Sequence, residues 1–146
     1  MKGNIFMVAG GPVSWESKQQ EIATLSTIEA EYVAFTRVTT QALWLTKFFN
    51  EIGLPIKSPI EIRADNDGSI SNSINDKNYR RTKHINVKHH FIRERTARGE
   101  VLFKYILSSD NLADIFTKPL PRDTIWKLTM YLKHENPPTM MVQGEC

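Results

Sequence analysis

The longest amphipathic pattern in the chain runs from Ser26 to Ile52. Positions spaced alternately three and four residues apart along it are apolar with one exception: Ile28, Glu31, Phe35, Val38, Ala42, Leu45, Phe49 and Ile52. This spacing predicts one long helix with a single buried stripe. Ser26 and Glu29 fit a capping box at its start, and Gly53 follows its end. Glu31 would place a carboxylate on the buried face, which is unfavourable unless the charge has a role.

Shorter apolar runs on both sides of this helix predict strands. Asn4–Ala9 and Val13–Ser17 flank the turn residues Gly10, Gly11 and Pro12 and predict a β-hairpin. Ile60–Ala64 and Val101–Leu107 predict two later strands. Because helical patterns separate these two, they should be parallel and joined by a right-handed crossover.

The remaining patterns predict four further helices and a tail. The helical segments are Ser69–Asn75, Ile85–Arg98, Leu112–Thr117 (after a row of cap residues, Ser108–Asn111) and Asp123–Lys133. We expect a mixed α/β sheet with helices packed on it in residues 1–120, a C-terminal helix in 121–133, and a disordered tail in 134–146.

Composition narrows the class of protein. The 146 residues are 40% hydrophobic and 24% charged, with a formal net charge of +3, which is an ordinary globular balance. No apolar run is long enough to span a membrane, and the start does not look like a signal peptide. The single cysteine, Cys146, cannot form an internal disulfide, so a reducing intracellular compartment, cytoplasm or nucleus, is expected.

Three acidic residues stand at positions that a metal site would use. Glu31 lies on the apolar stripe, Asp65 follows the strand Ile60–Ala64, and Asp114 is in the first turn after Val101–Leu107. Carboxyl ends of parallel strands line the ligand crevice of open α/β sheets, and clustered carboxylates suit Mg²⁺. Each acid also has a structural interpretation: a side chain that reaches solvent at Glu31, a turn residue at Asp65, and a helix-dipole partner at Asp114.

A basic segment, Asn78–Arg98, lies between the two later strands. Cations are interleaved with Tyr79, Phe91 and three histidines, a mixture that suits contact with a nucleic-acid strand. The candidate contact residues are Arg81, Lys83, His84, Lys88, His90 and Arg93. The alternative is a solvated face whose charge Glu94 and Glu100 balance.

These features occur in stretches whose order is typical of one family. The stretches are GGPVSWESKQQ, LSTIEAEYVA, RADNDGSI, RRTKHINVKHHFIRE and LADIFTKPLPR, and they cover most of the chain from about Phe6 to Leu132. In this order they resemble the ribonuclease H domain at the C-terminal end of copia-type retrotransposon Pol polyproteins.

The resemblance implies a fold, an activity and a set of ligands. It implies a ribonuclease H-like mixed sheet of five strands in the order 3-2-1-4-5, flanked by helices. It implies hydrolysis of the RNA strand of an RNA–DNA hybrid by metal-bound carboxylates, next to the reverse transcriptase portion of the same polyprotein. Carried over by motif, Glu31 of EAEYVA, Asp65 of RADN and Asp114 of LADIFTK would be catalytic residues and ligands of Mg²⁺ or Mn²⁺ in a two-ion site.

One element of the family pattern has no match. The family's first strand, which is central in its sheet and supplies the first catalytic aspartate, would precede Met1, and no aspartate precedes Asp65. We therefore expect a truncated domain that lacks its central strand and an incomplete two-ion site. The neighbouring strands would expose edges, pair directly, or accept a strand from another chain.

Three functional hypotheses follow. The first is a ribonuclease H with impaired activity, inactive or inefficient alone because the first aspartate is absent. The second is a catalytically inactive, nucleic-acid-binding remnant of a transposon polyprotein. The third is a decayed fragment without a stable fold.

Overall fold

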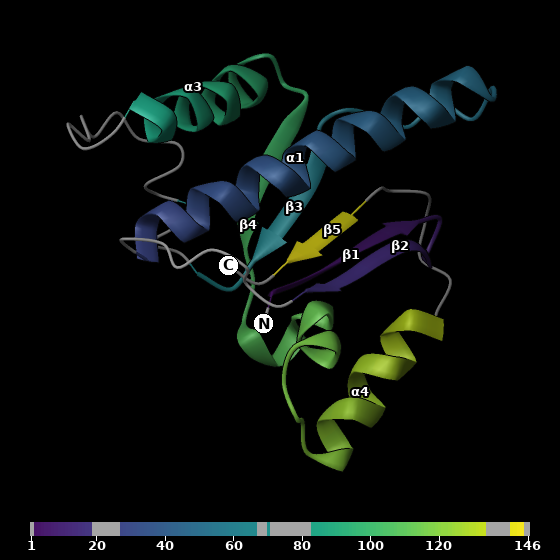
Figure 1. The fold of residues 1–146 in the computed structure, drawn as a ribbon. Helices are drawn as coiled ribbons and strands as arrows, with labels where there is room; N and C mark the ends of the chain where they lie inside the picture. The colour runs from purple at the N-terminus through teal and green to yellow at the C-terminus, as the bar shows by residue number, and fades with distance from the viewer. Residues whose placement is uncertain (1, 19–26, 67–69, 71–82, 134–140, 145–146) are drawn as a thin grey trace.

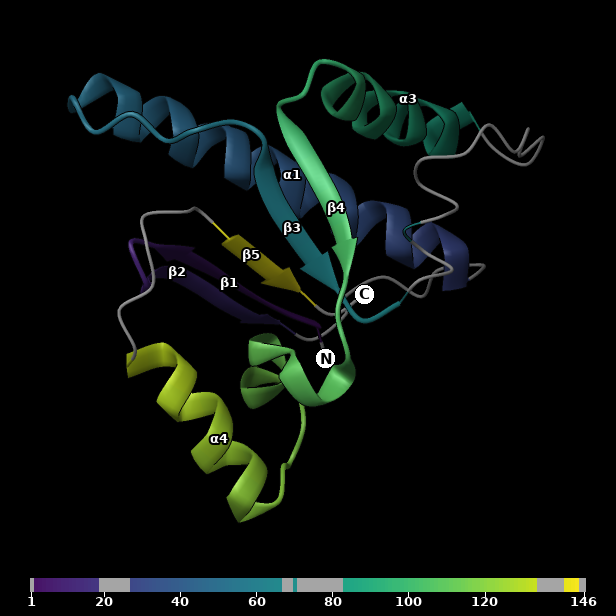
Figure 2. The ribbon, with the colours of Figure 1, turned by 180° about the vertical axis from the view of Figure 1, so that it is seen from behind.

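The computed structural model describes residues 2–18, 27–66, 70, 83–133 and 141–144 of the chain. In chain order these form β1 (Lys2–Val8), β2 (Gly11–Lys18), α1 (Thr27–Glu51), β3 (Ile60–Ala64), α3 (Lys83–Ala97), β4 (Val101–Tyr105), the 3₁₀ turns η1 (Ser108–Asp110) and η2 (Leu112–Phe116), α4 (Arg122–Lys133) and β5 (Met141–Gly144). The helices cover both faces of one sheet: α1 and α3 lie on one side, and the 3₁₀ turns and α4 on the other (Figures 1 and 2). No helix in the described ranges is both long and apolar enough to cross a membrane.

The sheet has five strands in the order β2-β1-β5-β3-β4. The strand β1 is antiparallel to β2 and to β5, whereas β3 is parallel to β5 and to β4. The predicted parallel pairing of the two later strands is thereby confirmed. The sheet also has a central strand, which differs from the expectation of a sheet without one. That central position belongs to β5, the last strand in the sequence.

The strand β5 falls within the segment that the sequence predicts to be a disordered tail. Met141–Gly144 is instead a strand paired on both sides, while residues 134–140 and 145–146 lie outside the described residues. The strand forms because its backbone N–H and C=O groups pair with those of β1 and β3. Backbone pairing depends little on side-chain type, so a four-residue segment gives little sign of it in the sequence.

The hairpin at the start of the sheet has a tight turn. Val8 pairs with Gly11, so the loop consists of Ala9 and Gly10, and both have positive φ values of 52° and 81°. Two such residues form the type I′ turn that matches strand twist. The predicted hairpin is confirmed, with its turn earlier than Gly10–Pro12. Pro12 lies inside β2, which is an edge strand with a bulge, where a missing N–H is tolerated.

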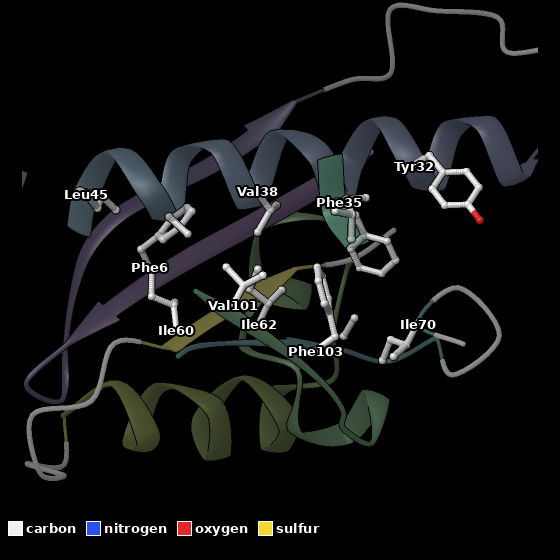
Figure 3. Close-up of a cluster of buried hydrophobic side chains, with 13 residues drawn as sticks. Phe6, Tyr32, Phe35, Val38, Leu45, Ile60, Ile62, Ile70, Val101 and Phe103 are labelled. Atoms are coloured by element: carbon white, nitrogen blue, oxygen red, sulfur yellow. The ribbon is translucent and has the colours of Figure 1, made fainter. Parts of the chain in front are cut away.

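The predicted stripe of α1 faces the sheet over most of its length. Phe35, Val38, Ala42 and Leu45 are all buried and pack with residues of β1, β3 and β4 (Figure 3). Phe35 meets Phe103 of β4 edge to face, with ring centroids 5.2 Å apart. Ile52 at the end of the stripe is 52% exposed, contrary to the pattern, because α1 extends past the sheet (Figure 1).

A second core fills the other face of the sheet. The strand β1 contributes Ile5 and Met7 to this face and Phe6 to the opposite one, as the alternation of a strand requires. Ile5 and Met7 pack with Leu112 of η2 and Leu128 of α4. The predicted helix Leu112–Thr117 is instead a short 3₁₀ turn that packs on this face of the sheet. The predicted helices Ile85–Arg98 and Asp123–Lys133 are both present, within two residues of their expected bounds. Of the predicted helix Ser69–Asn75, only Ile70 is described, and it is helical.

Candidate functional site

The carboxyl ends of β3 and β4 form the edge at which the predicted site would lie. Asp65 directly follows β3, and its carboxylate accepts a hydrogen bond from Ser108 Oγ at 3.0 Å. Ser108 begins η1, which follows β4, and the backbone N–H of Ile106 donates to the carbonyl of Ala64 at 2.9 Å. The two strand ends are thus fastened together, and the half-buried Asp65 carboxylate stands at their junction. Its predicted place at a strand end is confirmed.

Asp114 is buried in η2, the 3₁₀ turn that packs against β1. It is only 4% exposed and lies in η2, whose preceding residue Asn111 caps the turn by accepting a hydrogen bond from Ala113 N at 3.1 Å. Lys118 Nζ lies 3.4 and 3.3 Å from the two carboxylate oxygens of Asp114. A buried carboxylate needs such a partner, because removal from water disfavours the charge.

A glycine lets η2 approach the sheet. A Cβ atom on Gly3 of β1 would lie 2.6 Å from Thr117 Cγ2 and 3.1 Å from the carbonyl oxygen of Ala113. The first distance is shorter than Cβ contacts reach and the second is tighter than most of them, so a side chain at position 3 would require Thr117 and the turn that carries Asp114 to shift away from β1.

Capping by Asn111 holds this turn in place, and its loss should be measurable. Asn111→Ala removes the side-chain acceptor for Ala113 N. We expect the free energy of unfolding to fall by about 1 kcal/mol, the usual effect of losing an N-cap. Urea denaturation measures the change, and Asn111→Ser, which keeps an oxygen acceptor, is the matched control. Equal stability of the Ala variant and the unmodified chain would contradict this role.

Glu31 lies in α1, and the position of its side chain is outside the described residues. The neighbouring Tyr32 is buried, with its ring against that of His89 on α3 at a centroid distance of 5.5 Å. This contact fixes the early part of α1 against α3. The expected metal-ligand role of Glu31 stays a prediction.

Asp65 and Asp114 offer hard oxygen donors, which is the chemistry that Mg²⁺ and Mn²⁺ prefer. Within the described ranges, no group of three or more His, Cys, Asp or Glu side chains is placed to hold a metal ion. The Lys118 ammonium also forms an ion pair with the Asp114 carboxylate. The donor types therefore fit a divalent cation, and binding at Asp114 would require Lys118 to move away.

The basic segment is described in part. Arg81 lies outside the described residues, and Lys83 and His84 belong to α3 with side chains outside them. On α3, His90 is exposed, whereas Lys88 and Arg93 are half-buried. Of these three side chains, His90 is thus the most exposed to solvent and the most accessible for the predicted contacts with nucleic acid.

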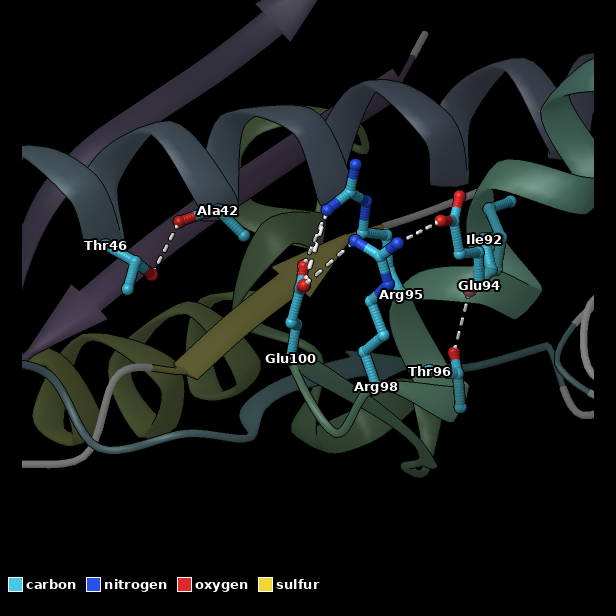
Figure 4. Close-up of polar contacts among 8 residues, drawn as sticks. All are labelled: Ala42, Thr46, Ile92, Glu94, Arg95, Thr96, Arg98 and Glu100. Carbon is cyan, nitrogen blue, oxygen red and sulfur yellow. Dashed lines mark hydrogen bonds and ion pairs between the residues drawn. The ribbon is translucent and has the colours of Figure 1, made fainter.

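Acidic side chains balance the C-terminal end of α3. Arg95 Nη1 lies 3.3 and 3.1 Å from the carboxylate oxygens of Glu100, and Arg98 Nη2 lies 2.6 Å from Glu94 Oε1 (Figure 4). Arg95 also stands over the ring of Phe91 at 5.2 Å. Glu100 and Glu94 thus pair with Arg95 and Arg98, which is the charge balance that the alternative interpretation expects.

A second charged cluster ties β3 to β4. Glu61 of β3 accepts from Arg63 on its own strand and from Lys104 on the neighbouring strand. Although partial burial acts to raise the pKa of Glu61, the hydrogen bonds from Lys104 and Arg63 outweigh it and lower that pKa below its ordinary value of 4.5.

This cluster predicts a pH dependence of stability. Because the pKa of Glu61 is lower in the folded chain, its contribution is fully present above about pH 4.5 and is lost as pH falls through the folded-state value. Glu61→Gln should lower the free energy of unfolding at neutral pH by about 1 kcal/mol or less, since the cluster is partly solvated. Denaturation at pH 7 and pH 3 tests this. The difference in the free energy of unfolding between variant and unmodified chain should be smaller at pH 3 than at pH 7, and an unchanged difference would contradict it.

Sequence reasoning missed two contacts of the candidate residues. Ser108 was expected only as a cap residue, and nothing local in the sequence indicates its bond to Asp65, 43 positions earlier. Lys118 stands four residues after Asp114, and this i,i+4 spacing is a signal that could have identified the pair.

Comparison with known proteins gives homologues for most of the chain. It is 39% identical over 121 residues to the retrovirus-related Pol polyprotein from transposon TNT 1-94 of Nicotiana tabacum, which is 83% of this chain and 9% of that protein. It is 33% identical over 120 residues to the Pol polyproteins from transposons RE2 and RE1 of Arabidopsis thaliana, 82% of this chain and 8% of each. The chain thus spans less than a tenth of these relatives. No family profile and no solved structure matches it.

Proposed function

We propose that this chain, whose homologues are retrotransposon Pol polyproteins, is a ribonuclease H segment of a copia-type element that hydrolyses the RNA strand of RNA–DNA hybrids. The observation that carries the proposal is Asp65, a half-buried carboxylate at the joined carboxyl ends of two parallel strands. The strand order β2-β1-β5-β3-β4 supports it, because it corresponds to the expected order 3-2-1-4-5 with β5 in the central position.

In this proposal Glu31, Asp65 and Asp114 hold Mg²⁺ or Mn²⁺. The bound cations would supply an activated water and stabilise the leaving oxygen at the scissile phosphate. Ser108 orients the Asp65 carboxylate through its hydrogen bond. Lys118 keeps the buried Asp114 carboxylate neutralised, and it competes with a cation for the same oxygens. This competition would weaken cation binding at Asp114, which agrees with the proposal of weak activity.

The substrate would lie along α3. Arg81, Lys83, His84, Lys88, His90 and Arg93 are the proposed contacts with the nucleic-acid backbone. Cations near a phosphate chain bind it largely by releasing its counterions, without reading sequence. The chain would act beside the reverse transcriptase portion of the same polyprotein, in the cytoplasm or nucleus.

A cleavage assay tests the proposal. The intact chain is incubated with a hybrid whose RNA strand is labelled, in Mg²⁺ and separately in Mn²⁺, with DNA duplex and RNA duplex of the same sequence as substrate controls. Cutting restricted to the RNA of the hybrid is expected. Glu31→Gln is the matched control, because it keeps the shape of the side chain and removes its charge. Product formation no higher than that of Glu31→Gln would refute the nuclease.

The Lys118–Asp114 pair favours a second candidate function, a catalytically inactive nucleic-acid-binding segment. Here the ammonium takes the place that a cation would need, and the basic positions on α3 remain. Binding to hybrid or duplex without cleavage is then expected, with an affinity that falls steeply as salt rises. A dissociation constant that does not change with salt would exclude this candidate.

A further inference from the structure

The ion pair between Asp114 and Lys118 joins two side chains of very different exposure. The side chain of Asp114 is 6% exposed, whereas that of Lys118 is 42% exposed. Lys118 Nζ lies 3.4 Å from Oδ1 and 3.3 Å from Oδ2 of the carboxylate. The ammonium thus reaches a buried carboxylate from the solvent side, on the flexible stem of a lysine. Lys118 can leave the carboxylate by rotation of its own side chain.

The turn around Asp114 holds the carboxylate in place. The backbone N–H groups of Thr117 and Lys118 both donate to the carbonyl oxygen of Asp114, at 3.1 and 3.0 Å. At the start of the turn, the side chain of Asn111 accepts a hydrogen bond from Ala113 N. A change of partner at the carboxylate therefore requires movement of the Lys118 side chain and none of the backbone.

A bound cation and the Lys118 ammonium cannot share the Asp114 carboxylate, because like charges at such short distances repel each other. The ammonium needs another anion when a cation binds. Under the proposed function that anion is near, since Mg²⁺ and Mn²⁺ in such sites also contact phosphate oxygens of the substrate. A phosphate accepts charge-assisted hydrogen bonds from a lysine as a carboxylate does. It is thus a chemically suitable second partner for Lys118.

We propose that a nucleic-acid phosphate draws Lys118 away from Asp114 and so opens this carboxylate to the cation. Without nucleic acid, Lys118 keeps the carboxylate closed to cations. With it, the ammonium pairs with the phosphate and the carboxylate is available. Binding of nucleic acid then strengthens cation binding, and by reciprocity the cation strengthens nucleic-acid binding by the same factor. The exchange rests on the proposed function for its cation site, but it does not require cleavage.

Manganese binding to the chain without nucleic acid is the first test. The paramagnetic resonance signal of free Mn²⁺ gives the dissociation constant. Lys118→Met removes the ammonium and should tighten Mn²⁺ binding by about fivefold or more, the lower end of usual coupling factors between sites. Lys127→Met is the matched control, because Lys127 pairs with the exposed Asp110 at 2.7 Å. Its Mn²⁺ affinity should equal that of the unmodified chain. An affinity that Lys118→Met leaves unchanged overturns the proposal.

Hybrid binding is the second test. The probe is a fluorescently labelled hybrid whose RNA strand is 2′-O-methylated, and gel electrophoresis checks that it stays intact. Its dissociation constant is measured by anisotropy with Mn²⁺ and with monovalent salt of equal ionic strength. Mn²⁺ should improve hybrid binding of the unmodified chain and of Lys127→Met by the same factor, and that of Lys118→Met by a factor about fivefold smaller or less. Equal factors for all three chains overturn the proposal.

The exchange and the nuclease can fail separately. A chain that shows both effects of Lys118→Met and cuts no RNA refutes the nuclease alone, whereas a chain that cuts RNA without these effects refutes the exchange alone. If Lys118→Met does not fold, the ¹³C resonance of Lys118 Cε in the unmodified chain decides. This resonance should respond more to Mg²⁺ and hybrid together than to either alone, and any other pattern overturns the proposal.

Discussion

Val142→Pro should strongly destabilise the chain and lower the temperature at which it unfolds. Val142 lies in the middle of the central strand, opposite Phe6 and Ile62. Proline has no N–H to donate, and its ring is incompatible with a strand paired on both sides. The expected loss is at least the cost of leaving a buried backbone group without its hydrogen-bond partner, about 1–3 kcal/mol, a substantial part of the roughly 5–15 kcal/mol that stabilises a typical domain.

Thermal denaturation followed by circular dichroism measures this effect. Val142→Ala is the matched control, because it shortens the same side chain and keeps the backbone N–H. A large difference between the two variants isolates the backbone contribution of β5. A Val142→Pro variant that melts within a few degrees of the Val142→Ala variant would show that β5 is not needed for the fold.

Asp65→Asn should reduce cleavage of the hybrid by about 100-fold or more, equivalent to about 2.7 kcal/mol of transition-state stabilisation. Under the proposed function, the substitution removes the negative charge that holds a cation while keeping the size of the side chain. An amide oxygen can still accept the hydrogen bond from Ser108, so the fold should be little affected.

The control for Asp65→Asn is the same substitution at an exposed acid. Asp123 lies in the first turn of α4 and is exposed. Initial rates of RNA cleavage are compared for both variants and the unmodified chain at equal Mn²⁺ concentration. Asp123→Asn should retain full activity, and equal rates for the two variants would remove Asp65 from the site.

The sequence predicted those parts of the fold whose hydrophobic pattern is long or is bounded by clear turn and cap residues. The helix α1 follows from its stripe of Phe35, Val38, Ala42 and Leu45, all of which are buried. The hairpin follows from glycines at its turn, and the strand β3 from the alternating residues Ile60–Ala64 with turn residues from Asp65 onward. These signals are local, so they can be read without knowledge of the tertiary structure.

The central strand could not be predicted in the same way. Four residues, Met141–Gly144, are too few for an apolar alternation, and Gly144 disfavours a strand by propensity. Their pairing partners are about 80 and 135 positions away, so the strand exists because of tertiary pairing. The same reasoning applies to the Asp65–Ser108 bond, whereas the Asp114–Lys118 pair is local and its spacing could have indicated it.

The end of α1 shows a limit of the stripe argument. Ile52 continues the apolar spacing but is exposed, together with Trp44 and Phe48, whose rings stack 5.6 Å apart. Apolar periodicity predicts which face of a helix is buried. It does not predict how far the covering sheet extends along that face.

The central claim is that the chain's own C-terminal strand joins the two halves of the sheet and so assembles the edge that carries Asp65. Nuclear Overhauser effects between backbone protons in dilute solution test this claim most directly. We predict contacts of Val142 with Phe6 and with Ile62, in the antiparallel and parallel patterns that the register gives. Direct contacts between β1 and β3, with random-coil chemical shifts for residues 141–144, would contradict it.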